Sequence, residues 1–152
     1  PDEIEDPEKM AVYVDHRGDG KWGFAGREYE PENDQRYVTT RVRSFGRQYA
    51  LRADRQPPEI SQVQPADGSR LPAQTGLKLS ASIKDEGSGI GLEEDIVMLL
   101  DGQRLISVYD PDANLVEFSS NQRQRSGVHE LVVRVTDQCG NEATRTSRFT
   151  IE

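Results

Sequence analysis

Two aspartates stand where alternating apolar patterns end, and they are the residues best placed to do chemistry. Asp85 follows the alternating segment 77–83, and Asp137 follows the alternating segment 131–135. Alternation of apolar and polar residues is typical of strands with one buried face. If both strands end at the same edge of a β-sandwich, the two carboxylates lie close together.

Carboxylates that approach one another can ligate Ca²⁺ together with loop carbonyl oxygens. Asp85 and Asp137 are therefore the candidate metal ligands. The alternative is that each Asp accepts backbone N–H bonds within its own turn. The sequence favours this second interpretation, so we expect no cofactor, with Ca²⁺ as the alternative.

Two other acidic segments resemble calcium loops but lack the required ligands. Segment 15–20 has Asp15 and Asp19 at positions one and five, but Arg17 at position three. Segment 110–114 has Asp110, Asp112 and Asn114 at the first ligand positions, but Leu115 stands at position six and Asn121 at position twelve, where such loops use Gly and a bidentate Glu. Both segments are predicted to be turns.

No recognisable catalytic constellation accompanies these acids. His129 shares its alternation with Leu131 and Val133, which predicts a partly buried, hydrogen-bonded ring. Cys139 lies in a predicted turn, so we expect it to be accessible, but nothing marks it as activated. No Ser, Cys or Lys nucleophile stands in a motif near His129. The sequence therefore predicts a protein that is not an enzyme.

The elements that must position these residues are strands. From residue 59 to 152 the pattern predicts seven short strands, with an Asp101-Gly102 hairpin and a closing pair around the turn at 137–141. Only one short helical turn, at 93–95, is expected. This pattern predicts an immunoglobulin-like β-sandwich.

A smaller β unit precedes the sandwich. Residues 1–9 are an acidic lead-in, and residues 10–54 carry four predicted strands at 10–14, 21–24, 35–43 and 47–52. Residues 55–58 form a proline-rich linker. A sheet of this size is marginal alone, so we expect the unit to be truncated and to expose an apolar face. The fold class is thus all-β, an immunoglobulin-like sandwich after a smaller antiparallel module.

Charge limits the partners. The net charge is −8, which disfavours nucleic acid and anionic membrane surfaces. No apolar run is long enough for membrane insertion. The chain begins with Pro1, so we expect a piece of a longer protein.

The motifs resemble a known module. They are Ile83-Lys84-Asp85-Glu86-Gly87-Ser88-Gly89-Ile90, Leu100-Asp101-Gly102, Tyr109-Asp110-Pro111-Asp112, Gly127-x-His129-x-Leu131 and Asp137-x-x-Gly140-Asn141. This set resembles the accessory C-terminal, immunoglobulin-like region of exported lysostaphin-type zinc metallopeptidases and other bacterial envelope proteins. Tyr13, Trp22, Phe45-Gly46 and Pro57-Pro58 are similar to the segment that precedes that module. With only two histidines in the chain, the resemblance implies an accessory role and not hydrolysis.

The function predicted is therefore a non-catalytic structural module, extracellular, periplasmic or on the cell surface. It would space or dock neighbouring domains of the parent protein. The first alternative is a carbohydrate-binding accessory module that contacts cell-wall or surface glycan through some of six aromatic residues. These are Tyr13, Trp22, Tyr29, Tyr37, Tyr49 and Tyr109. The second alternative is a fragment that completes an active site elsewhere in the parent enzyme.

Overall fold

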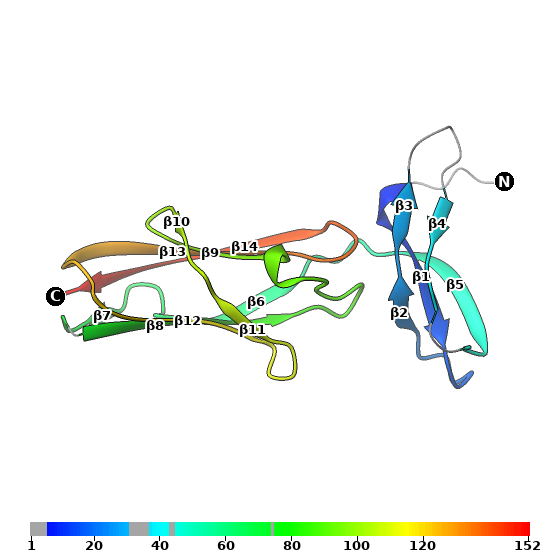
Figure 1. Cartoon of the computed structure of the whole chain (residues 1–152), viewed down its shortest axis with the longest axis horizontal. Helices are drawn as coiled ribbons and strands as arrows, with labels where there is room; N and C mark the ends of the chain where they lie inside the picture. The colour runs from blue at the N-terminus through cyan, green and yellow to red at the C-terminus, as the bar shows by residue number, and fades with distance from the viewer. Residues whose placement is uncertain (1–5, 31–36, 43–44, 74) are drawn as a thin grey trace.

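Two β units make up the chain (Figure 1). The computed structural model describes residues 6–30, 37–42, 45–73 and 75–152. The N-terminal unit is a small sheet at one end, and a longer two-layered sandwich extends from it to the C-terminus. β5 ends at Ala53 and β6 begins at Glu59, and no strand crosses the segment between them. The proline-rich stretch thus lies between two separately paired sets of strands.

The N-terminal unit centres on β1 (Met10–Asp15), which follows a 3₁₀ turn, η1 (Pro7–Lys9). β1 lies between β2 (Gly23–Gly26) and β5 (Gln48–Ala53), and both pairings are antiparallel. A separate hairpin joins β3 (Glu28–Glu30) and β4 (Tyr37–Thr39).

The four strands expected in this unit are described to different extents. Those expected at 10–14, 21–24 and 47–52 correspond to β1, β2 and β5, whereas β3 was not expected. Of the strand expected at 35–43, β4 covers 37–39; the prediction is wrong for residues 40–42, which are not in a strand, and residues 35, 36 and 43 lie outside the described ranges.

The sandwich has two sheets that face each other (Figure 1). The first, in the order β11-β12-β8-β6, comprises β11 (Val108–Asp110), β12 (Leu115–Arg123), β8 (Thr75–Lys84) and β6 (Glu59–Gln64). The second, in the order β10-β9-β13-β14-β7, comprises β10 (Gln103–Arg104), β9 (Ile96–Leu100), β13 (Gly127–Thr136), β14 (Glu142–Ile151) and β7 (Arg70–Leu71). The first two strands of the sandwich thus lie in different sheets. β6 pairs antiparallel with β8 in the first sheet, and β7 pairs parallel with β14 in the second. This arrangement is the immunoglobulin-like all-β fold that the sequence predicts.

The core follows the predicted alternation. Leu131, Val133 and Val135 of β13 are fully buried, while Arg134 between them is exposed. They belong to one apolar cluster that both sheets contribute to. Its other members are Ile60, Leu77, Leu79, Ala81, Ile83, Ile96, Met98, Leu100, Val116, Phe149 and Ile151. This core fixes the register of the strands whose ends carry the candidate site.

One strand prediction is wrong in its extent. Asp101 and Gly102 do adopt positive φ values of 52° and 79°, as a tight hairpin requires. However, the single strand expected at 103–109 is two short strands, β10 and β11, in opposite sheets. Ile106 is 92 % exposed between them, because the chain crosses from one layer to the other there. Alternation over these seven residues did not distinguish one strand from two. The strand β7 has only two residues and was not predicted, because so short a strand shows no alternation.

Helical structure is confined to single turns in the described ranges. The turn expected at 93–95 is η3 (Glu93–Asp95). Its start is capped by Asp95, whose Oδ2 accepts a hydrogen bond from the Leu92 N–H at 2.9 Å.

Candidate functional site

Three carboxylates meet where the N-terminal unit contacts the end of the sandwich. Asp85 follows β8 and Asp137 follows β13, and the structure places them together as the sequence predicts. Asp54 joins them from the end of β5. One carboxylate oxygen from each residue lies within 4.8 Å of those of the other two. Asp54 and Asp137 are buried and Asp85 is half-buried. We call this contact between the two units the joint.

Asp137 organises the β13–β14 turn of the joint. Its Oδ1 accepts hydrogen bonds from the backbone N–H groups of Cys139 at 2.9 Å and Asn141 at 2.8 Å. Its Oδ2 accepts one from the Asn141 side-chain amide at 2.7 Å. The same amide nitrogen donates to the backbone oxygen of Asp54 at 3.1 Å. The turn is therefore bonded directly to the residue that follows the last strand of the N-terminal unit.

The loop after β8 is held from both units. Asp85 Oδ1 accepts hydrogen bonds from the N–H groups of Gly87 at 3.0 Å and Gly89 at 2.6 Å. Between them, the Ser88 N–H donates to Asp54 Oδ2 at 2.6 Å. Gly87 lies against the Asp54 carboxylate, and a Cβ there would overlap its oxygens. The close approach of the two units thus depends on glycine at position 87.

Electrostatics in the joint follow from burial and from the shared negative charge. Burial raises the pKa of Asp85, the N–H groups of Gly89 and Gly87 oppose that rise, and the nearby carboxylates of Asp137 and Asp54 add to it. Oxygen ligands of this kind suit a hard cation such as Ca²⁺.

Lys9 forms hydrogen bonds with two backbone carbonyl groups of the β13–β14 turn. The ammonium of Lys9 donates to the backbone oxygens of Cys139 at 3.1 Å and Gly140 at 2.9 Å. These are carbonyls of the kind that a calcium site would draw from the turn. The observed bonds at Asp85 and Asp137 are those of the turn interpretation, and they leave fewer oxygens for an ion.

Aromatic side chains complete the joint on its apolar side. Tyr13 and Phe24 meet edge to face, with ring centroids 5.8 Å apart. They pack with Trp22 and Cys139 into a small cluster separate from the sandwich core. The Arg52 guanidinium lies 5.8 Å from the centroids of both Tyr13 and Trp22, within the range of cation–π attraction.

The expected accessibility of Cys139 is wrong. Its exposed fraction is 2 %, because the β13–β14 turn packs against Tyr13 of the N-terminal unit. Burial raises the pKa of the thiol, so Cys139 is less reactive than a free cysteine. A turn read from sequence alone gives no sign that a second unit covers it.

The two calcium-like segments are hydrogen-bonded turns. The Asp15 carboxylate accepts bonds from the N–H groups of Arg17, Gly18 and Gly20 at 3.0, 2.6 and 2.8 Å. Although desolvation alone would raise it, the pKa of Asp15 is lowered because these donors stabilise the anion. Asp110 accepts bonds from two backbone N–H groups of its own turn in the same way.

The predicted environment of His129 is also present. The ring is buried, and both of its nitrogens have hydrogen-bond partners. It lies near the start of β13, at the end of the sandwich opposite the joint, so it plays no part in the acidic cluster.

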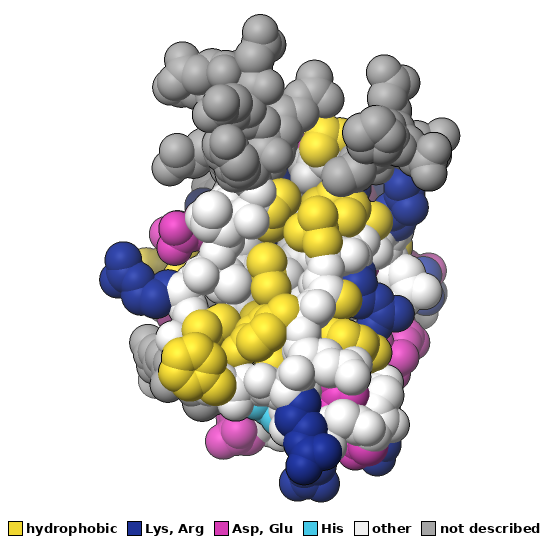
Figure 2. All heavy atoms as spheres, turned by 90° about the vertical axis from the view of Figure 1, so that its right-hand side faces the viewer, with side chains coloured by type: hydrophobic (Ala, Val, Ile, Leu, Met, Phe, Trp, Pro, Cys, Tyr) yellow, Lys and Arg dark blue, Asp and Glu magenta, His cyan; other side chains and the backbone are white. Residues whose placement is uncertain are grey.

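An apolar face of the N-terminal unit is exposed, as its small size led us to expect. Figure 2 shows hydrophobic side chains gathered on the side of the molecule that faces away from the sandwich. Among the described residues of this unit, the exposed large apolar side chains are those of Val42, Phe45, Tyr49 and Leu51, and Phe45 is 95 % exposed.

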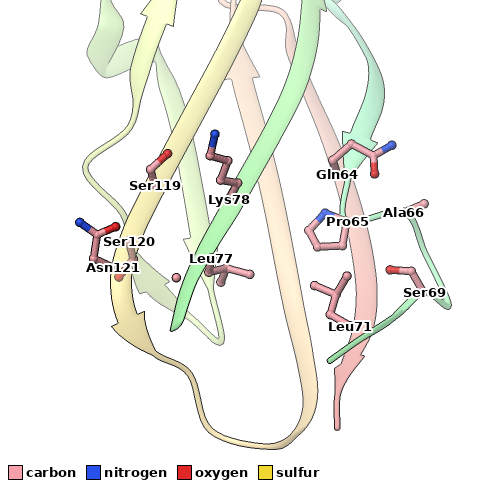
Figure 3. A pocket seen from close by; sticks show the side chains of 11 residues that line it. Gln64, Pro65, Ala66, Ser69, Leu71, Leu77, Lys78, Ser119, Ser120 and Asn121 are labelled. Carbon is pink, nitrogen blue, oxygen red and sulfur yellow. The ribbon is translucent and has the colours of Figure 1, made fainter. Parts of the chain in front are cut away.

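A hollow of about 490 Å³ opens at the far end of the sandwich. Figure 3 shows Pro65, Leu71 and Leu77 directed into it from segments of both sheets. Its walls carry polar groups of Ser69, Lys78 and neighbouring residues but no cluster of acids or histidines. In the described part of the chain this hollow brings no catalytic set together.

Sequence reasoning missed three residues of the joint. Asp54, Ser88 and Asn141 form hydrogen bonds between the units, in which Asp54 accepts from the other two. Asp54 directly precedes the proline-rich linker, and this position next to a unit boundary was the available signal. Nothing local marks Ser88, whose role depends on the tertiary contact.

Comparison with known proteins gives structural likeness only. No protein-family model matches the sequence, and no curated protein matches it. Among solved structures, CopC from Methylosinus trichosporium OB3b is 13 % identical with a TM-score of 0.45, over 62 % of this chain and 93 % of that one. PcoC, a methionine-rich copper resistance protein from Escherichia coli, is 12 % identical with a TM-score of 0.47, over 64 % of this chain and 100 % of that one. The Ig1-2 module of the Drosophila receptor protein tyrosine phosphatase DLAR is 13 % identical with a TM-score of 0.43, over 64 % of this chain and 50 % of that one.

These identities of 12–13 % transfer no ligand or activity to this chain. The assignment to the immunoglobulin-like all-β class is carried by the strand order and by the facing sheets described above.

Proposed function

We propose that this chain is a non-catalytic structural unit that holds two β modules at a fixed angle. In that way it spaces or docks neighbouring domains of a larger protein. The observation that carries the proposal is the joint, where buried hydrogen bonds and an aromatic cluster connect the modules. Domains in one chain usually move relative to each other unless their contact is extensive and well packed.

Three kinds of contact act together in the joint. The Asp54 side chain and backbone bind Ser88 and Asn141 of the sandwich, and the Lys9 ammonium binds the β13–β14 turn. The Tyr13 and Cys139 contact adds apolar burial. Each buried hydrogen bond contributes about 0.5–1.5 kcal/mol, and more where a partner is charged. Because a hinge motion would break several of these contacts at once, the joint supports a single orientation.

The setting that we propose is an exported protein of the bacterial envelope, outside the cytoplasm. The motif resemblance to accessory regions of lysostaphin-type peptidases and other envelope proteins supports this setting. Its partners would be the adjoining domains of the parent protein. No helix in the described ranges is long and apolar enough to cross a membrane.

Residual dipolar couplings of backbone amides test the proposal. A fixed joint predicts that one alignment tensor fits both modules, residues 10–53 and 59–152. Two tensors of clearly different magnitude would show independent motion and would contradict the structural role. A pull-down with purified cell-wall glycan runs beside it, and saturable binding would favour the carbohydrate alternative instead.

A second candidate function is cation binding in the joint. The meeting of Asp54, Asp85 and Asp137 favours it, because the three offer carboxylate oxygens from both modules. A bound Ca²⁺ would stabilise the folded state by mass action, so the melting temperature would rise with added Ca²⁺. Asp85→Asn should abolish that rise while retaining the carbonyl oxygen that accepts the Gly87 and Gly89 bonds. A melting curve unmoved by Ca²⁺ leaves the hydrogen-bonded turns as the whole role of these acids.

The glycan alternative has less support. Two of the six aromatics, Tyr13 and Trp22, are engaged in the joint. The side chains of Tyr29 and Tyr37 lie outside what the structure describes. Tyr49 is exposed, but its hydroxyl accepts a hydrogen bond from the Gly46 N–H.

A further inference from the structure

His129 joins two loops at the end of the sandwich away from the joint. It is 8 % exposed, and its ring stacks on Phe149 with centroids 5.6 Å apart. Its Nδ1 lies 2.7 Å from Asp101 Oδ2, in the β9–β10 turn. Its Nε2 lies 2.8 Å from the backbone oxygen of Arg125, in the β12–β13 connection. One side chain thus contacts both connections.

Both partners of the ring are acceptors. A carboxylate oxygen and a carbonyl oxygen carry no hydrogen to donate. A neutral imidazole donates from only one nitrogen, so it leaves the other lone pair facing an oxygen. The imidazolium donates from both nitrogens. Both hydrogen bonds can therefore form only when the ring is protonated. When the ring loses its proton, one of the two bonds is lost.

Among the described residues, charges of both signs lie around this site. Asp101 approaches from the β9–β10 turn, and its Oδ1 also accepts the Glu130 N–H at 2.8 Å. The Glu130 carboxylate is paired with Arg148 of β14. Arg123 and Arg125 come from the β12 end and line the adjacent hollow. Phe149 contributes no charge.

The ionisation of the pair agrees with this geometry. Burial alone would lower the pKa of His129, but the hydrogen bonds to Arg125 and Asp101, together with the Asp101 charge, raise it above the usual value of 6.5. For Asp101, desolvation would raise the pKa, yet the bonds from the Glu130 N–H and His129 lower it below 3.8.

We propose that protonated His129 fastens the β12–β13 connection to the β9–β10 turn, so that this end of the sandwich loosens when the ring loses its proton. We call this set of contacts between His129, Asp101 and Arg125 the histidine clamp. A hollow of about 460 Å³ is lined by all three residues, so the clamp also sets the shape of that hollow. The inference is independent of the joint and of the proposed structural function.

The sign of the pH dependence follows from the two shifts. The stabilisation from His129 is fully present below pH 6.5 and is lost as the pH rises through the higher pKa of the folded state. The stabilisation from Asp101 is present above pH 3.8 and is lost as the pH falls through its lower folded-state pKa. The clamp is therefore strongest in mildly acidic solution.

NMR titration of the imidazole tests the proposal. His16→Gln, which removes the other histidine, leaves His129 as the only ring to observe. We expect a midpoint above 6.5, and amide exchange at residues 124–126 that accelerates above this midpoint after correction for intrinsic exchange. A midpoint at or below 6.5, or corrected exchange that is the same on both sides of it, would overturn the clamp.

Asp101→Asn supplies the matched variant. Asparagine tolerates the positive φ at this position and can still accept the Glu130 N–H bond, so the fold is retained. The variant removes the negative charge and replaces the oxygen that faces Nδ1 by an amide NH2, which can donate to a neutral ring, so the His129 midpoint should fall relative to the parent protein. An unchanged midpoint would show that Asp101 does not hold the proton on His129 and would refute the clamp.

Discussion

Replacing Asp137 by Ala removes three hydrogen bonds from the joint. Two of the three donor groups still have a second hydrogen-bond acceptor after the substitution. The Cys139 N–H also bonds Ser88 Oγ at 3.2 Å, and the Asn141 amide nitrogen also bonds the Asp54 backbone oxygen. The Asn141 N–H is left without an acceptor in a buried site. An orphaned buried donor costs about 1–3 kcal/mol, and bonds to a charged acceptor are worth a similar amount.

Relief of charge repulsion offsets part of that cost. The charge of Asp137 contributes to the raised pKa of Asp85, so removing Asp137 favours the ionised form of Asp85. Because the orphaned donor and the lost charged bonds outweigh this relief, we expect the free energy of unfolding to fall by about 2 kcal/mol. The melting temperature should fall by about 4–8 °C in a chain of this length. Urea unfolding in EDTA measures the change without interference from bound cations.

Asp110→Ala is the matched control. Its carboxylate also accepts two backbone N–H bonds in an Asx turn, at 3.0 and 3.1 Å, but the turn is exposed and water replaces the lost acceptor. We expect a change within about 0.5 kcal/mol, as is usual for surface sites. If the free energies of unfolding of the two variants differ by less than about 0.5 kcal/mol, the claim that burial makes the Asp137 hydrogen bonds more stabilising than those of an exposed turn is wrong.

Three other substitutions or reactions probe the same structure. Gly87→Ala places a methyl group against the Asp54 carboxylate and should destabilise the joint, whereas Gly23→Ala, with open space around it, should have little effect; equal melting temperatures would contradict the close packing. Leu79→Ala in the sandwich core should lower the free energy of unfolding by about 2–5 kcal/mol, and a loss below 1 kcal/mol would refute the assigned core. Cys139 should react with a thiol reagent only as fast as the protein opens, so rapid labelling of the native protein would show that the joint is not closed.

Local patterns carried most of the fold prediction. Leu131, Val133 and Val135 recur at every second position of β13, and the structure buries all three on one face. The Asp101-Gly102 pair needs positive φ at both residues, which only a few residue types adopt easily, so the hairpin could be read directly. The approach of Asp85 and Asp137 followed from the same reasoning, since strands of opposite sheets end together.

Tertiary contact decided what the sequence could not predict. The segment 103–109 alternates as one strand would, but its residues divide between two sheets because the chain crosses the sandwich edge at Ile106. Cys139 looked exposed because a turn normally faces solvent, yet the N-terminal unit covers it. Asp54 was assigned to a unit boundary, and only the packing of the two units shows that its carboxylate binds the Ser88 loop.

The fixed joint is the central claim, and a pulsed electron–electron distance measurement tests it most directly. Spin labels at Lys21→Cys and Gln103→Cys report on the two units from exposed sites, while the buried Cys139 stays unlabelled. The account predicts one narrow distance distribution in the otherwise unchanged protein and a broader or shifted one when Gly87→Ala is added. A broad distribution without the Gly87 substitution would contradict it, because the two units would then move independently.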